Sequence, residues 1–293
     1  MFSVPEDFAT YTIARAGKEG REWIANLPAL VARLCKQWNL VIEGATMHGG
    51  LSVTIPVHQH KRPCILKVGW VDSSTEHEAL ALKAWNGKGV VQLLDVEPAE
   101  GAMLLERLDS NRSLNAIPLE EALPIAGSLL RRLAIPAPAG FPHLKEVGLH
   151  IAETLPQRWE QCGQPLPRRL LDRACHLAGS LAPFADNLLV NYDLIFEDVL
   201  AGKREPWLVV DPKVVVGDPE YGVAQLLWVR LEAMQEGKGL ATYFDTLVSS
   251  AQLDLELARL WTVVRCVDYW LWGLSVGLTE DPKRCKAITD WLI

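Results

Sequence analysis

The stretch that decides the fold is residues 188–212, which read LLVNYDLIFEDVLAGKREPWLVVDP. It contains two short apolar runs separated by a turn at Ala201-Gly202-Lys203, a pattern that predicts strands. Asp193 follows the first run, Asp211 ends the second, and Asp198 lies five residues after Asp193. This pattern allows three carboxylates to converge at one edge. Aspartate is also common in turns, and Asp-Pro pairs especially so, which leaves a purely structural role open.

Converging carboxylates of this kind have two chemical uses. Mg²⁺ takes oxygen ligands, and it combines one or two carboxylates with phosphate oxygens and water. An alcohol nucleophile needs a nearby carboxylate to accept its proton. Asp193, Asp198 and Asp211 together meet both demands, so the rest of the chain decides between a structural and a chemical role.

The chain around this stretch has two parts that differ in residue pattern. Residues 1–108 begin with an amphipathic helix over 20–38 and continue with short β-branched segments and one further helix over 74–85, capped by Ser73 or Ser74. The expected antiparallel strands lie at 40–57, 64–68, 90–96 and 103–108. Residues 109–293 are helical and rich in Leu and Ala, apart from a strand-like island at 188–216. This α+β order predicts two lobes, 1–108 and 109–293, and excludes a strictly alternating doubly wound sheet.

Lys67 lies inside the apolar run CILKV, where an unpaired ammonium group is costly. Glu78 follows eleven residues later on the predicted helix. A strand lysine paired with a glutamate on the next helix is how kinases hold the α and β phosphates of a nucleotide. The alternative is a lysine at a sheet edge that reaches water. Ahead of it, Gly49 and Gly50 join two predicted strands, as a phosphate-covering loop does, although simple hairpins use the same pair.

The order of these parts is more specific than any single part. A glycine-rich hairpin, a strand lysine, a helix glutamate, a hinge strand, a D-x-x-x-x-D segment and a strand ending in Asp-Pro make up the parts of a phosphoryl-transfer enzyme. Over most of its length the chain resembles the aminoglycoside/hydroxyurea antibiotic resistance kinases. The matching segments are GREWIANLP at 20–28, EALALKAW at 78–85 with 91–94, LLERL at 104–108, EPWLVVDP at 205–212 and VGDP at 216–219.

This resemblance implies a protein-kinase-like fold, with an N-terminal antiparallel sheet lobe and a mainly helical C-terminal lobe. It also implies transfer of the γ-phosphoryl group of ATP, or GTP, to an alcohol of a small molecule with the help of Mg²⁺. The expected roles are as follows: Asp193 as catalytic base with Asn191 beside it, Asp211 and Asp198 on the metal, and Lys67, Glu78, Gly49, Gly50, Glu106 and Leu108 around the nucleotide.

Two positions depart from the family's usual H-x-D-x-x-x-x-N loop. Asn191 stands at the histidine position and Asp198 at the asparagine position. Asn191 can still donate a hydrogen bond, so we expect the loop to keep its shape. Asp198 adds negative charge beside Asp211, which tightens Mg²⁺ binding and slows its release. The departures therefore raise an alternative, a degenerate kinase that binds nucleotide without efficient turnover.

A polybasic substrate needs carboxylates and aromatic walls. The helical lobe offers four candidates, Glu197, Asp218, Asp268 and Trp272. Most of the 11 tryptophans are expected in the core, which is the competing explanation for any one of them. The expected substrate is a streptomycin-like aminoglycoside. No acidic residue lies between 273 and 276, directly after Trp272, and this absence raises an endogenous sugar or amino alcohol as the alternative substrate.

Charge and hydropathy limit the partners. The chain has 29 Lys and Arg against 36 Asp and Glu, a formal net charge of -7, which is the wrong sign for a protein that binds nucleic acid. A cationic or small-molecule ligand suits this charge better. We find no secretory pattern at the start and no apolar run of about 20 residues, so we expect a cytoplasmic protein with no membrane partner. The oligomeric state stays open.

Overall fold

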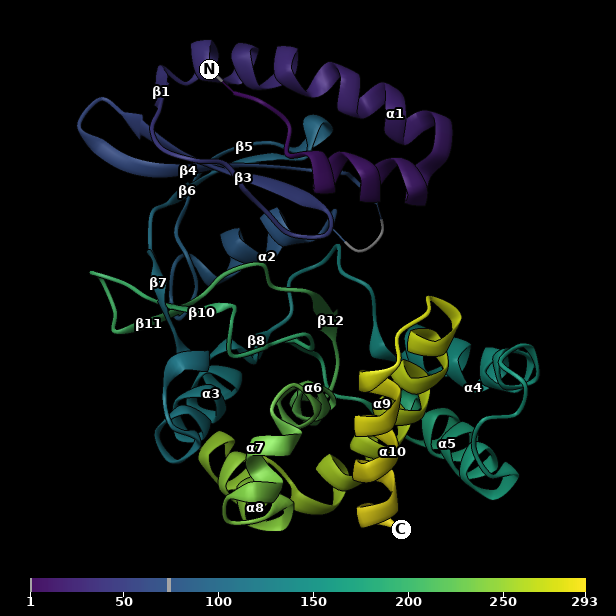
Figure 1. Cartoon of the computed structure of the whole chain (residues 1–293). Helices are drawn as coiled ribbons and strands as arrows, with labels where there is room; N and C mark the ends of the chain where they lie inside the picture. The colour runs from purple at the N-terminus through teal and green to yellow at the C-terminus, as the bar shows by residue number, and fades with distance from the viewer. Residues whose placement is uncertain (1, 73–74) are drawn as a thin grey trace. The chain divides into compact units, whose positions relative to one another are not determined.

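The computed structural model describes residues 2–72 and 75–293 (Figure 1). It divides into two compact units, Met1–Asp109 and Ser110–Ile293. The expected boundary between 108 and 109 lies one residue before this division. Each unit has its own buried core and is described by itself.

The first unit is built on one antiparallel sheet with the spatial strand order β1-β3-β4-β6-β5, and β2 also pairs with β3. The strands are β1 Leu40–Ile42, β2 Met47–His48, β3 Ser52–Gln59, β4 Arg62–Gly69, β5 Leu93–Glu97 and β6 Ala102–Glu106. The central strands are rich in aliphatic and β-branched residues, which suit a covered sheet. The predicted antiparallel sheet in this part of the chain is therefore confirmed.

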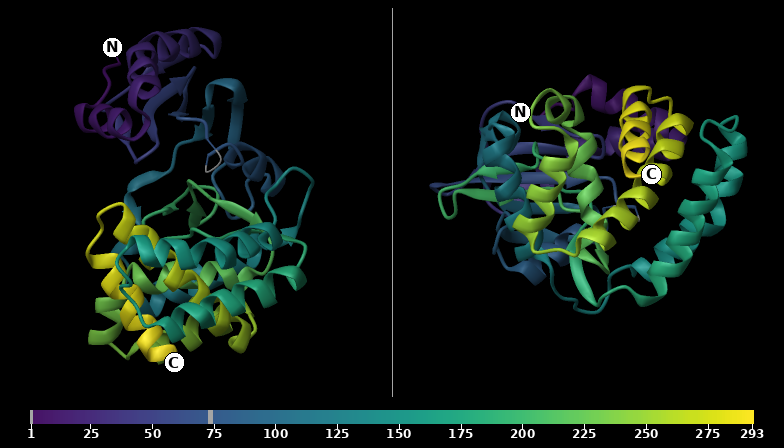
Figure 2. Two further views of the ribbon diagram at one scale, coloured as in Figure 1. Left: turned by 90° about the vertical axis from the view of Figure 1, so that its right-hand side faces the viewer. Right: turned by 90° about the horizontal axis from the view of Figure 1, so that it is seen from below.

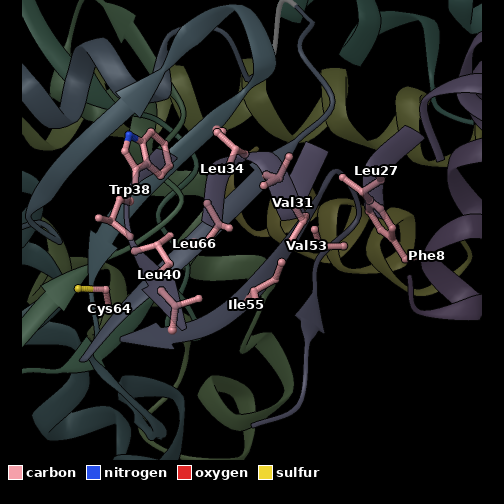
Figure 3. Packing of buried hydrophobic residues seen from close by; sticks show 14 residues of the cluster. Phe8, Leu27, Val31, Leu34, Trp38, Leu40, Val53, Ile55, Cys64 and Leu66 are labelled. Atoms are coloured by element: carbon pink, nitrogen blue, oxygen red, sulfur yellow. The ribbon is translucent and has the colours of Figure 1, made fainter. Parts of the chain in front are cut away.

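One long helix supplies the core of this unit. Helix α1 (Glu6–Gln37) places Leu27, Val31 and Leu34 at helical spacing, and they belong to the same buried cluster as Ile55 of β3 and Leu66 of β4 (Figure 3). Side chains three and four residues apart share one helix face, so this stripe covers the sheet. Burial of these aliphatic groups is the main force that holds helix and sheet together.

Helix α1 begins fourteen residues earlier than the helix expected from residue 20 (Glu6 against Gly20). Gly17 interrupts its geometry with φ 58° and ψ -124°, a conformation that glycine adopts without steric cost. The kink shifts the apolar stripe between the two halves. The sequence periodicity therefore reveals only the second half.

Helix α2 (Glu78–Trp85) begins later than the expected residue 74, and the proposed caps Ser73 and Ser74 lie outside the described residues. It ends at Asn86, which takes the left-handed conformation with φ 47°. Glu78, Ala81, Leu82 and Trp85 form its buried face. Glu78, in the first turn, therefore points into the unit.

The second unit holds two small sheets, with strand orders β11-β10-β7 and β12-β9-β8. The strands are β7 Asp109–Ser113, β8 Ile135–Pro136, β9 Leu188–Asn191, β10 Val199–Ala201, β11 Trp207–Val209 and β12 Val214–Val216. The strand-like island at 188–216 thus supplies four of them. β7 and β8 lie outside this island, in a part of the chain that was expected to be helical. Pro136 is tolerated because β8 is an edge strand.

Helices make up the rest of the second unit (Figure 2). They are α3 Leu119–Leu133, α4 Leu144–Gln161, α5 Arg168–Leu181, α6 Val223–Trp228, α7 Leu231–Glu236, α8 Leu240–Ala251, α9 Leu255–Ser275 and α10 Glu280–Leu292. α9 packs against α10 and also contacts α4, α5, α6 and α8. Within the described ranges, no helix combines the length and the apolar character that crossing a bilayer requires.

Candidate active site

The predicted pairing of Lys67 with Glu78 forms inside the first unit. The Lys67 Nζ donates hydrogen bonds to both carboxylate oxygens of Glu78, at 2.8 Å to Oε1 and 2.7 Å to Oε2. Lys67 is 8% exposed and Glu78 is 5% exposed. β4 fixes the lysine and the first turn of α2 fixes the glutamate. Two buried opposite charges with this geometry hold each other in place, and removal of either deprives the other of a charged hydrogen-bond partner.

The glycine pair lies in the hairpin between β2 and β3. The Gly49 N–H donates to the Ser52 carbonyl at 3.0 Å, which closes the turn. A Cβ atom at Gly49 would meet no atom within 4 Å, and one at Gly50 would meet only the Tyr11 ring, at 3.8 Å. Neither glycine has a positive φ. The fold of this unit does not itself demand glycine here, so close approach of a ligand to this backbone is a remaining reason for the pair.

The expected hinge follows β6. The Glu106 N–H donates to the Gln92 carbonyl at 3.0 Å, and Glu106 Oε1 accepts from the Gln92 N–H at 2.8 Å. These two bonds fix the chain that leads into β5. Leu108 is half-buried in the two-residue gap between β6 and β7.

Asn191 shapes the loop that carries Asp193. Asn191 ends β9 and is 2% exposed, and its Oδ1 accepts a hydrogen bond from the Asp193 N–H at 3.1 Å. The Tyr192 N–H donates to the Lys213 carbonyl at 3.0 Å, so both sides of the loop are anchored. Asn191 therefore holds the loop by accepting a hydrogen bond, where the sequence suggested that it would donate one. The Asp193 side chain lies partly exposed at the end of this loop.

Strand pairing brings Asp198 and Asp211 to the same end of a hairpin. Val199 of β10 pairs with Val209 of β11, and the Val210 N–H donates to the Asp198 carbonyl at 2.8 Å. Asp211 then leaves β11 with φ 50°, a left-handed conformation that aspartate tolerates better than most residues.

These two carboxylates fit Mg²⁺ by their donor chemistry. Mg²⁺ binds proteins through one or two carboxylates and takes its other ligands from substrate phosphates and water. In residues 2–72 and 75–293, no group of three or more His, Cys, Asp or Glu forms an all-protein metal cluster. A cation held by Asp198 and Asp211 would therefore need oxygens from a bound nucleotide to complete its ligands.

Lys213 is a site residue that the sequence analysis missed. Its Nζ donates to Asp193 Oδ2 at 2.9 Å. Burial alone would lower the pKa of Lys213, but the charge and hydrogen bond of Asp193, with help from Asp211, outweigh burial and raise that pKa. The available signal was its position directly after Asp211-Pro212, next to a group of carboxylates in need of a counter-charge.

Arg265 was also missed, although a lone arginine in the apolar run WTVVRCV of α9 calls for partners. It is buried, with its guanidinium over the rings of Tyr192, Tyr221 and Trp228 at 5.3, 4.8 and 5.7 Å from their centroids. Its Nη2 donates to the Tyr192 carbonyl at 3.4 Å, directly before Asp193. Burial alone would lower the pKa of Arg265, but Tyr221 and Asp193 outweigh it and raise the pKa.

The expected substrate residues lie in different surroundings. Asp218 is 5% exposed, and its oxygens accept from the Asp186 N–H at 2.8 Å and from Trp261 Nε1 at 2.7 Å, so this carboxylate is committed to the fold. Asp268 Oδ1 accepts from Arg158 Nη1 at 2.6 Å. Glu197 is exposed, four residues after Asp193, and Trp272 is 46% exposed on α9.

The second unit therefore brings one group of residues together. Lys213 and Arg265 lie around the loop that carries Asp193, and Asp211 lies near enough to influence Lys213. Asp218 stands apart, buried against Trp261. The Lys67–Glu78 pair belongs to the other unit.

The whole chain is similar to several known proteins. The family model for aminoglycoside/hydroxyurea antibiotic resistance kinases matches residues 37–277. A streptomycin 6-kinase of Streptomyces griseus is 35% identical, over 99% of this chain and 96% of the relative. A hydroxyurea phosphotransferase of Kitasatospora aureofaciens is also 35% identical, over 100% of this chain and 86% of the relative.

Two solved structures bear on the fold. A thermostable mutant of aminoglycoside phosphotransferase APH(4)-Ia, in a ternary complex with ADP and hygromycin B, aligns with a TM-score of 0.62 at 17% identity, covering 88% of this chain and 96% of that one. The choline kinase LicA from Streptococcus pneumoniae aligns with a TM-score of 0.59 at 13% identity, covering 90% and 98%. These alignments confirm the predicted protein-kinase-like fold.

Proposed function

The chain belongs to the aminoglycoside/hydroxyurea antibiotic resistance kinase family, and on this premise we propose that it transfers the γ-phosphoryl group of ATP to a hydroxyl of a streptomycin-like aminoglycoside. The observation that carries the proposal is the catalytic loop. Asn191 fixes the backbone of Asp193, and Lys213 fixes its carboxylate. A rigidly held carboxylate at this position is what a kinase needs to orient a hydroxyl nucleophile.

Each charged group has a part in the proposed reaction. Asp193 accepts the proton of the substrate hydroxyl, whose oxygen forms a bond to the γ-phosphorus while the bond to the bridging oxygen breaks and ADP leaves. Lys67, held by Glu78, places positive charge on the α and β phosphates. Such a reaction depends on positioning and charge neutralisation more than on covalent chemistry by the protein.

Asp198 and Asp211 would hold Mg²⁺ in this scheme. When bound, Mg²⁺ neutralises charge on the phosphate oxygens. Asp198, at the position where the family usually has asparagine, adds a second carboxylate to the site. We expect Asp198 to tighten metal binding without abolishing activity. The loop stays ordered because Asn191 accepts a hydrogen bond from the Asp193 N–H.

The test is ADP release and mass analysis of the acceptor, with Mg²⁺ and ATP, against streptomycin, hygromycin B and hydroxyurea. GTP in place of ATP tests the choice of nucleotide. We expect phosphorylated streptomycin from the wild type and none from Asp193→Ala. Asp172→Ala, an exposed aspartate in α5, is the matched control and should keep full activity.

A second candidate is the degenerate kinase, which the changed loop positions Asn191 and Asp198 favour. It predicts nucleotide binding without product from any acceptor. The double variant N191H/D198N distinguishes the two functions. Turnover that appears only in this variant would support the degenerate kinase, whereas turnover in the wild type rejects it. Because the proposed reaction consumes ATP, we place the protein in the cytoplasm.

A further inference from the structure

Three aromatic rings in the second unit form a stack that runs from the core to the surface. Trp228 of α6 and Tyr269 of α9 stack with centroids 4.5 Å apart and an interplanar angle of 8°. Tyr269 stacks on Trp272, one turn later on α9, at 5.2 Å and 30°. Trp228 is fully buried, whereas Trp272 is 46% exposed. An exposed tryptophan at the end of an ordered stack offers a preformed aromatic surface to a ligand.

The inner end of this stack is connected to the loop that carries Asp193 through Arg265. Arg265 lies over Trp228 and also donates to the carbonyl of Tyr192, the residue before Asp193. Burial and the carboxylate of Asp281 raise the pKa of Tyr269, and Asp193 is close enough to add to the shift. The stack therefore belongs to the surroundings of the proposed base.

The carboxylates beside the stack are already paired. Asp268, the neighbour of Tyr269, binds Arg158 through its side chain at 2.6 Å and through its carbonyl at 2.7 Å. Asp281 accepts from the Tyr269 hydroxyl at 3.1 Å and from Arg284 at 3.0 Å. An arginine thus already neutralises each of these carboxylates, which weakens their attraction for an ammonium group of a substrate. The ring faces of the stack are the other recognition element at this place.

We propose, on the basis of the proposed kinase function, that Trp272 and the stack behind it bind a planar, delocalised N–C–N group of the acceptor, with guanidinium as the strongest binder. The same stack already holds one such group, because the Arg265 guanidinium lies over the Trp228 ring, 5.7 Å from its centroid. A planar cation gains both stacking and attraction to the ring face, and it is more weakly hydrated than an ammonium group. Trp272 is thus a specificity-determining residue that favours guanidino over amino substituents.

The experiment compares streptomycin, which carries guanidino groups, with kanamycin, whose nitrogens are amino groups. Titration calorimetry without nucleotide gives Kd, and steady-state kinetics give KM and kcat. The variants are Trp272→Ala and Trp272→Phe, with Phe184→Ala as the control because Phe184 is an aromatic residue 87% exposed in the same unit. Each purified variant is checked by circular dichroism.

We expect Trp272→Ala to raise Kd and KM for streptomycin by about five- to thirty-fold, with kcat changed less than about two-fold. Trp272→Phe should retain most of the affinity, and Phe184→Ala all of it. Affinity for kanamycin should not respond to Trp272. Three results would overturn the proposal: no binding of streptomycin to the wild type, an unchanged Kd in Trp272→Ala, or an equal loss for kanamycin.

The experiment tests the binding role of Trp272 and the kinase function separately. Wild-type protein that binds streptomycin without phosphorylating it contradicts the proposed function, while the calorimetric comparison still supports or overturns the binding role of Trp272. Conversely, streptomycin phosphorylation that is unaffected in Trp272→Ala supports the kinase function and overturns the binding role of Trp272.

Discussion

The Nζ atom of Lys213 lies 2.9 Å from Oδ2 of Asp193, so the proposed base is held by an ion pair before any substrate arrives. The lysine belongs to the segment that joins β11 to β12, and its own carbonyl accepts from the Tyr192 N–H at 3.0 Å. One residue thus fixes the catalytic loop through its backbone and its side chain. The charged side chain can be removed while the backbone hydrogen bond is retained.

Lys213→Met should lower kcat by about ten- to hundred-fold, because the Asp193 carboxylate loses the partner that orients it and that carries positive charge beside the transferred phosphoryl group. Steady-state kinetics with saturating Mg²⁺ and ATP measure this. Lys203→Met, a lysine in the turn that the sequence predicts between the two apolar runs, is the control and should leave kcat unchanged. An unchanged kcat in Lys213→Met would show that the ion pair is merely structural.

The same ion pair predicts how stability changes with pH. Because the pKa of Lys213 is raised in the folded protein, its charge contributes stability that is fully present below the unfolded value of about 10.4. That contribution is lost as pH rises through the folded pKa. The difference in free energy of unfolding between wild type and Lys213→Met should be constant between about pH 7 and pH 9 and should shrink above about pH 10. Urea unfolding at each pH measures it, and a difference that grows with pH would contradict the assignment.

Glu78→Ala should destabilise the protein by about 3 kcal/mol or more, because the buried Lys67 loses the carboxylate that accepts two of its hydrogen bonds. The double variant K67M/E78L should recover much of this loss, since apolar groups often replace a buried ion pair at little cost. The control is Glu22→Ala, which removes the exposed Lys18–Glu22 pair and should change stability by less than about 0.5 kcal/mol. Both Lys67 and Glu78 variants should lose nucleotide affinity, including the double variant with restored stability.

Gly222 packs directly against the catalytic loop. A Cβ atom at this position would lie 2.8 Å from the Asn191 carbonyl oxygen, which is too close for either to stay in place. Gly222→Ala should therefore displace the loop, lower kcat and cost about 1–3 kcal/mol of stability. Gly179→Ala is the matched control, because its Cβ would meet only the Ala152 methyl at 3.9 Å. That helical substitution should be neutral or stabilising by up to about 1 kcal/mol. Wild-type kcat in Gly222→Ala would mean that the loop has more freedom than this contact allows.

The sequence predicted those features that depend on residues close together in the chain. Lys67 in an apolar strand needed a partner, and Glu78 on the next helix was the available one. The apolar runs of residues 188–212, each followed by an aspartate, predicted strands in this region, and the structure has β9, β10 and β11 there. The roles of Lys213 and Arg265 were not predicted, because they depend on which chain segments pack against the loop that carries Asp193. Asp218 looked like a substrate carboxylate, yet tertiary packing against Trp261 buries it. The first half of α1 was not predicted, because the kink at Gly17 shifts the helical period.

Asp198→Asn restores the amide that the family usually has at this position and removes one negative charge beside Asp211. We expect the Mg²⁺ concentration that gives half-maximal activity to rise several-fold, because the cation loses one charged oxygen ligand. Asp211→Asn should abolish activity at any Mg²⁺ concentration, since Asp211 is the main ligand in the proposed site. ADP release measured across a Mg²⁺ titration, after removal of bound metal with a chelator, tests both variants. An unchanged Mg²⁺ requirement in Asp198→Asn would show that Asp198 contributes no ligand, and the metal site would then rest on Asp211 alone.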